Sequence, residues 1–153
     1  MAEESSSVAS PASTATELAM RRTGMAFQRT RMAADRTLMA VIRTALSLIS
    51  FGFTIHTFFN KLKDAGVLKG AAAARNFGES LVLLGIVMLI LGIVYHVMFM
   101  LGLRRERSEM KAAGLVRAES GFPVSLVLLV ALTLLLIGLA AALSMIAHVG
   151  PYE

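Results

Sequence analysis

The sequence contains no cysteine and no tryptophan, and it has only 3 prolines in 153 residues. Without cysteine there is no disulfide framework, no thiolate nucleophile and no cysteine-based metal site. Charge is also scarce, because Asp, Glu, Lys and Arg make up 16% of the chain whereas hydrophobic residues make up 56%. Soluble domains average about 25% charged residues. The composition therefore disfavours a soluble globular protein and favours a membrane protein.

Three long segments, residues 38–59, 80–103 and 123–147, are almost free of charged residues. As an α-helix, with a rise of about 1.5 Å per residue, each is long enough to cross a hydrocarbon core of about 30 Å. Transmembrane strands are excluded because three of them would leave unpaired edges in lipid. The sequence therefore predicts an all-α integral membrane protein with three transmembrane helices.

Basic residues distinguish the two sides of this predicted membrane protein. They are concentrated before residue 38 and between the second and third segments, and they are fewer between the first and second. The positive-inside rule then predicts a cytoplasmic N-terminus and a C-terminus on the outside. Residues 1–17 lack the apolar core of a signal peptide, and we expect a disordered cytoplasmic tail there, followed by one membrane domain at residues 18–148. The net charge of +5 follows from this topology, so no nucleic-acid partner is expected.

A seven-residue repeat precedes and enters the first apolar segment. Four consecutive lines read RTGMAFQ, RTRMAAD, RTLMAVI and RTALSLI, and each begins with an arginine: Arg22, Arg29, Arg36 and Arg43. A helix drifts only about 20° per heptad, so these arginines form one slowly winding stripe. The repeat predicts a single helix from about residue 18 to 59, with an amphipathic cytoplasmic part that continues into the first transmembrane span.

The stripe continues into the membrane with uncharged polar residues. From Arg43, same-face spacings reach Ser47, Ser50 and Thr54. In one interpretation, these hydroxyls bond carbonyls of their own or a neighbouring helix, while Arg43 reaches back to the lipid phosphates. In the other, the face lines an aqueous or anion-accessible path between helices, because charge within a membrane is costly and tends to mark function. The sequence leaves both open.

The second apolar segment contains Tyr95 and His96, which are candidates for a polar contact inside the membrane. His96 could pair with a carboxylate, relay a proton or make an interhelical hydrogen bond. Gly85 and Gly92 lie on one helix face and could admit a close helix neighbour. No HExxH or P-loop motif occurs, and no two histidines have metal-ligand spacing. No catalytic residue, cofactor or metal site is therefore expected, and an enzyme is the least favoured class.

The stretch ADRTLMAVIRT fits the pattern A-[ED]-R-T-x-x-A-x-x-R-T and resembles the DUF202 family of small bacterial inner-membrane proteins, the YidH-like proteins. The resemblance extends over residues 20–105 and includes ARNFGESLVLLGIVMLILGIVYH. One departure is Val41, where the family usually has tryptophan. The resemblance implies a location in the bacterial inner (plasma) membrane.

The same three-span domain is similar to the membrane part of the eukaryotic vacuolar transporter chaperone complex, whose domains form a ring that passes polyphosphate. The resemblance implies a homo-oligomer in which Arg36 and Arg43 face an inorganic anion. It also implies that Asp35 is an acidic gate or a salt-bridge partner. Polyphosphate synthesis is not implied, because no matching catalytic domain is present.

Two functions follow as hypotheses. The first is an oligomeric anion channel or translocator whose path is lined by a polar face of the first span, comprising Arg36, Arg43, Ser47, Ser50 and Thr54. The second is a structural or accessory membrane protein that binds anionic lipid headgroups or a cytoplasmic partner through its basic N-terminal helix. The lipid-headgroup candidates in that helix are Arg21, Arg22, Arg29 and Arg31.

Overall fold

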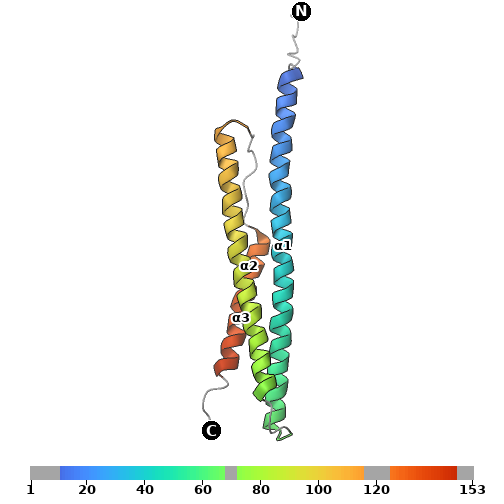
Figure 1. Ribbon diagram of the computed structural model, residues 1–153, viewed down its shortest axis with the longest axis vertical. Coiled ribbons are helices and arrows are strands. Elements are labelled where there is room, and N and C mark those ends of the chain that lie inside the picture. The colour runs from blue at the N-terminus through green and yellow to red at the C-terminus, as the bar shows by residue number, and fades with distance from the viewer. Residues whose placement is uncertain (1–10, 68–71, 116–124, 148–153) are drawn as a thin grey trace, which may run out of the picture. The chain divides into compact units, whose positions relative to one another are not determined.

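The computed structural model describes residues 11–67, 72–115 and 125–147, and in these ranges its regular structure consists of three α-helices (Figure 1). Helix α1 is Pro11–Asp64, α2 is Ala72–Ala112 and α3 is Leu126–Ala147. Each contains a stretch that is long and apolar enough to cross a membrane. The prediction of an all-α protein with three membrane-crossing helices, the first continuous with an N-terminal helical extension, is confirmed.

Helix α1 begins earlier than the sequence pattern indicated. Residues 11–17 were expected to belong to a disordered tail, but α1 starts at Pro11. Proline suits the first position of a helix because its fixed φ is already helical and its missing N–H is not needed there. Arg21 and Glu17 add an ion pair of 2.7 Å one turn apart. Residues 1–10 of the expected tail and residues 123–124 of the expected third span lie outside the described residues.

Helices α1 and α2 also end later than the apolar segments do. At the end of α1, Gly66 has φ +71°, and the amide of Val67 donates to the carbonyl of Leu62 at 3.1 Å. This is a Schellman motif, in which a left-handed glycine satisfies the last free carbonyls of a helix. The same pattern closes α2 at Gly114, whose φ is also +71°. Residues 60–79 and 104–122 connect the predicted spans. Of these, residues 60–64, 72–79 and 104–112 are helical.

The described residues pack as two units. The first, called the arm here, contains residues 11–33 of α1 and the chain from 99 to 115. Its core consists of buried Phe27 and Leu103, with Met110 packed against them. The second, called the membrane domain here, contains residues 34–67, 72–98 and 125–147.

All three helices contribute to the core of the membrane domain, and this core is apolar. One cluster joins Leu38, Ile42 and Ala45 of α1 to Leu89 of α2 and Ala131 of α3. A second cluster joins Val82 and Ile86 of α2 to Met145 of α3. Helix α2 therefore runs antiparallel to both α1 and α3. The tight apolar contacts leave no polar lining between the helices along these two clusters.

Glycines set the close spacing of α1 and α2. A Cβ atom built on Gly52 would lie 2.6 Å from the carbonyl oxygen of Gly78, and one built on Gly78 would lie 2.7 Å from that of Gly52. Any larger residue at either position would force the two backbones apart. A Cβ on Gly85 would lie 2.8 Å from Ile49, and one on Gly92 would lie 2.6 Å from Val41. The prediction that Gly85 and Gly92 admit a close helix neighbour is confirmed.

In the membrane domain, the start of the apolar segment of α1 does not lie at the same level as the end of the apolar segment of α2. Asp35 precedes the first segment, yet it lies beside His96, which lies well inside the second segment. A charged residue at a helix centre costs about 2.5–3.5 kcal/mol on the insertion scale, whereas Leu, Ile, Phe or Val each contributes about 0.3–0.6 kcal/mol.

Candidate functional site

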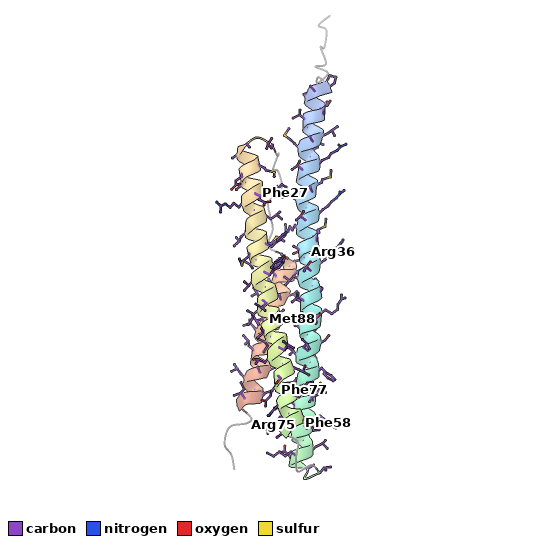
Figure 2. All side chains as sticks on the ribbon, viewed as in Figure 1. Phe27, Arg36, Phe58, Arg75, Phe77 and Met88 are labelled. Carbon is purple, nitrogen blue, oxygen red and sulfur yellow. The ribbon has the colours of Figure 1, made fainter. Side chains whose placement is uncertain are left out.

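The predicted polar face of the first span lies on the outer surface of the membrane domain. Arg36 (Figure 2) and Arg43 are exposed, as are Ser47, Ser50 and Thr54. The Ser47 hydroxyl donates to the Arg43 carbonyl at 2.9 Å, and the Thr54 hydroxyl donates to the Ser50 carbonyl at 2.8 Å. The hydrogen-bonding needs of these two hydroxyls are thus met within α1. Within the described ranges, neither arginine has an ion-pair partner.

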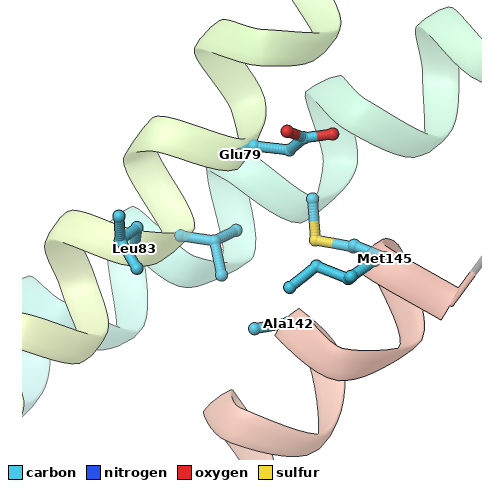
Figure 3. Close-up of a pocket in the computed structure, with 6 residues that line it drawn as sticks. Glu79, Leu83, Ala142 and Met145 are labelled. Carbon is cyan, nitrogen blue, oxygen red and sulfur yellow. The ribbon is translucent and has the colours of Figure 1, made fainter. Parts of the chain in front are cut away.

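A route for ions through the interior of one chain is not supported by the packing. Behind the polar face, the side of α1 that meets the other helices is apolar. A cavity of about 170 Å³ opens between α2 and α3 (Figure 3). Its lining is apolar except for Glu79, and consists of Glu79, Val82, Leu83, Ala142, Met145 and Ile146. It therefore lacks the several converging polar groups that hold a polar substrate.

The first of two buried polar clusters joins all three helices at one end of the membrane domain. The Ser125 hydroxyl donates to Asp35 Oδ1 at 2.8 Å, and His96 Nε2 lies 3.5 Å from the same oxygen. The His96 side chain is only 3% exposed and that of Asp35 is 24% exposed. Ser125 directly precedes α3, and its carbonyl accepts from the amides of Leu128 and Leu129. The carboxylate therefore lies at the positive end of the α3 dipole, which stabilises its charge.

The second cluster lies between α1 and α2 at the opposite end of the domain. His56 Nδ1 is 3.4 Å from Glu79 Oε1, and Arg75 Nε is 4.0 Å from that oxygen. The Asn60 amide nitrogen lies 2.9 Å from His56 Nε2. With the amide in this orientation, Asn60 donates to Nε2, and the ring proton is on Nδ1, facing Glu79. The buried histidine is thereby hydrogen-bonded at Nε2, while its Nδ1 lies near Glu79 without making a hydrogen bond.

The two clusters are reciprocal. In the first cluster, α1 supplies the carboxylate, Asp35, and α2 supplies the histidine, His96. In the second cluster, α1 supplies the histidine, His56, and α2 supplies the carboxylate, Glu79. Asp35 and His96 were singled out from the sequence, and the structure brings them together. Tyr95, also singled out, has its side chain 66% exposed on the outer surface. The sequence interpretation missed Ser125 and Glu79 as partners, because pairing across antiparallel helices depends on a register that hydropathy does not report.

The basic residues proposed to bind lipid headgroups lie in the arm. Arg21, Arg22 and Arg29 are exposed, and Arg31 is half-buried. Arg21 pairs with Glu17, but both side chains are exposed, so this pair adds little to stability. Helix α2 adds further basic residues to the arm, namely Arg104, Arg105, Arg107 and Lys111. The basic character of this unit thus comes from both helices.

A closed metal site is not present among the residues that the structure describes. No three histidine, cysteine, aspartate or glutamate side chains in residues 11–67, 72–115 and 125–147 come together in a way that could hold an ion. Each of the two polar clusters brings together only one histidine and one carboxylate.

Comparison with protein families gives one match. The family model described as "Domain of unknown function (DUF202)" matches residues 29–102. The matched segment includes Arg36 and Arg43 and both histidine–carboxylate pairs, whereas α3 with Ser125 lies beyond it. No curated protein and no solved structure matches the chain. A similarity to the vacuolar transporter chaperone complex stays a prediction.

Proposed function

The chain belongs to the DUF202 family and has three apolar, membrane-crossing helices, and from this premise we propose that it is an oligomeric translocator for inorganic anions. The path would run between copies of the chain, along the outer face of α1 that carries Arg36 and Arg43. Phosphate-like anions, including polyphosphate, are the substrate class that two arginines and a track of hydroxyls fit best. No catalytic step belongs to this proposal.

The observation that carries the proposal is the outward position of Arg43. Its Cα lies about one to two turns inside the first apolar segment, and its side chain points away from the closed core of its own chain. Facing lipid, a guanidinium at this depth is costly, and it reaches the headgroups only by stretching along the helix. Facing a water-filled path between chains, it keeps its hydration and attracts anions. Ser47, Ser50 and Thr54 extend the same face beyond Arg43.

The proposed path requires an oligomer, because it runs between copies of the chain. Like charges from several copies would repel one another unless water or an anion lay between them. A path between chains supplies that medium, whereas direct packing of arginine against arginine does not. We further propose that the protein lies in a bacterial inner membrane with its N-terminus in the cytoplasm and its C-terminus outside, as the distribution of basic residues favours.

Flux through purified protein in liposomes tests the proposal. We expect wild-type protein to release entrapped phosphate or short polyphosphate, and Arg43→Ala to reduce that release by about tenfold or more, because it removes an intramembrane positive charge. Arg43→Lys should retain part of the flux. Lys63→Ala is the control, since Lys63 is an exposed basic residue of α1 that lies beyond the apolar segment and off the proposed path. Equal flux in Arg43→Ala and wild type would remove Arg43 from the path.

The basic arm supports a second candidate function, an accessory protein that binds anionic lipid or an acidic cytoplasmic partner. Arg22 and Arg29 are exposed there, and each basic residue near an anionic surface contributes roughly 1 kcal/mol. This function predicts no intrinsic flux and a higher unfolding temperature in anionic than in neutral lipid. It is rejected if the two lipids give the same unfolding temperature.

A further inference from the structure

The two polar clusters mark limits on where the hydrocarbon layer can lie. Along α1, the distance from Asp35 to His56 is about 32 Å, and along α2 that from Glu79 to His96 is about 26 Å, at 1.5 Å per residue. A bilayer core is about 30 Å thick. Between the clusters, Arg36 and Arg43 are the charged residues on α1, while residues 80–95 and 126–147 carry no charge. The clusters thus bracket a layer with the thickness and composition of a membrane core.

The uncharged segment of α2 continues beyond this layer. It passes His96 and extends to Leu103, the residue before Arg104. In the arm, Leu103 packs with Phe27, so the residues of α2 just before Leu103 lie beside those of α1 just after Phe27. Those residues of α1 include Arg29 and Arg31. Placing all of residues 80–103 in hydrocarbon would therefore draw these arginines in as well.

Energetics favours leaving the end of the α2 segment outside. One charged residue at the centre of a span costs several times what one leucine contributes. The cost of placing Arg29, Arg31 and Asp35 in hydrocarbon is therefore larger than the gain from placing there the few apolar residues of α2 at the same level. This assignment differs from the prediction based on hydropathy, which places all of residues 80–103 in the membrane.

The surface of the arm at this level combines exposed apolar and basic side chains. On α1, Met32 is 52% exposed and follows exposed Arg29 by three residues, and on α2, Leu101 is 57% exposed and precedes exposed Arg105 by four. Arg105 Nε lies 3.4 Å from Glu109 Oε1, but both side chains are exposed, so this surface pair is weak and can give way to a phosphate. Both spacings put the two side chains on one helix face. Water solvates the arginines but not the apolar side chains, whereas hydrocarbon solvates the apolar side chains but not the arginines. The headgroup layer accommodates both, with apolar groups at the acyl boundary and guanidinium groups on phosphates.

We propose that residues 99–103 of α2 lie outside the hydrocarbon layer, at the level of the lipid phosphates, where Arg29, Met32, Leu101 and Arg105 form a collar that binds anionic phospholipid. Charge complementarity selects the occupant, because two exposed guanidinium groups beside apolar side chains match a phosphate joined to acyl chains. The lipid occupant rests on the second candidate function, the binding of anionic lipid by the arm. The assignment does not depend on the anion path, and it remains valid if the chain carries no flux.

The depth of Leu101 tests the placement. Because the chain has no native cysteine, Leu101→Cys and Leu91→Cys can each carry a single nitroxide label in the full-length protein in nanodiscs. Both positions are exposed in the uncharged segment of α2, at 57% and 63%. We expect position 101 to collide with a water-soluble nickel chelate and position 91 to collide with oxygen instead. A label at 101 that is as protected from the chelate as one at 91 would overturn the placement.

Lipid retention tests the occupant. In native mass spectrometry, the double variant Arg29→Gln/Arg105→Gln should retain about 30-fold less phosphatidylglycerol than wild type, with phosphatidylcholine unaffected. Lys63→Gln, which removes an exposed basic residue at the other end of the membrane domain, is the matched control and should change nothing. Equal retention of phosphatidylglycerol by the double variant and wild type would overturn the collar. Displacement of the lipid by inorganic phosphate would also overturn it, by assigning the arginines to the free anion.

Discussion

The hydroxyl of Ser125 donates a hydrogen bond of 2.8 Å to Asp35, and this contact ties the start of α3 to α1 across 90 residues of sequence. It is a polar tether on a helix that otherwise meets its neighbours through few buried residues, namely Ala131, Gly138 and Met145. The tether also fixes the register of α3, because it sets which turn of α1 the helix start must meet. Asp35 in turn approaches His96, so that one carboxylate organises three helices.

Ser125→Ala should therefore lower the free energy of unfolding by about 1.5–3 kcal/mol, the usual range for a hydrogen bond to a charged group. The measurement is reversible unfolding in mixed micelles. Thr133→Ala is the control, since the Thr133 hydroxyl donates to the Leu129 carbonyl of its own helix. If both variants lose the same stability, the tether has no special role.

Gly52 should tolerate no side chain. Gly52→Ala places a Cβ 2.6 Å from the backbone carbonyl of Gly78, so α1 and α2 must separate, at a cost of about 1–3 kcal/mol. Gly24→Ala is the matched variant on the same helix, because a Cβ there would meet no atom within 4 Å. It should leave stability unchanged or raise it by up to about 1 kcal/mol, as alanine is the better helix former. Equal effects of the two variants would contradict the close approach of α1 and α2.

His56 and Glu79 should be energetically coupled. In a double-mutant cycle with His56→Gln and Glu79→Gln, we expect a coupling of about 0.5–3 kcal/mol, as for other residues in one polar network. A cycle of His56→Gln with Ser144→Ala, an exposed residue of α3, supplies the baseline. Additive losses in the first cycle would mean that the 3.4 Å approach of the two side chains does not contribute to stability.

Gly114 should determine where α2 ends. Its φ of +71° suits glycine, and an alanine there costs about 1–2 kcal/mol because its Cβ crowds the backbone. Gly114→Ala should therefore speed amide hydrogen exchange in the last turn of α2, near Lys111. Gly102→Ala, in the helical part of the same arm, should not speed exchange there. Unchanged exchange in Gly114→Ala would show that the Schellman cap does not hold the helix end.

The apolar segments were sufficient to predict three helices and their approximate positions. They could not predict the helix ends, because hydropathy reports where a helix can contact lipid, while backbone capping at Gly66 and Gly114 decides where it stops. The face that carries Arg43, Ser47, Ser50 and Thr54 followed from helical spacing, and the structure leaves that face exposed.

The pairings of Asp35 and Glu79 could not be predicted from the sequence in the same way. They depend on the register of antiparallel helices, which the contacts at Gly52, Gly85 and Gly92 fix at the atomic level. A heptad repeat constrains one helix face and contains no information on which turn of a second helix lies opposite. Ser125 was missed for the same reason, because its partner lies 90 residues away in the sequence.

Water access to the outer face of α1 tests the central claim most directly. Single cysteines can replace Ser50 and Thr54 on the polar face, and Leu136, an apolar residue of α3 with 69% exposure, is the lipid-facing control. A membrane-impermeant thiol reagent should label Ser50→Cys and Thr54→Cys at least about tenfold faster than Leu136→Cys, because a thiol reacts as the thiolate, which needs water. Labelling of all three at the same slow rate would place the polar face against lipid or a packed helix and contradict a water-filled path between chains.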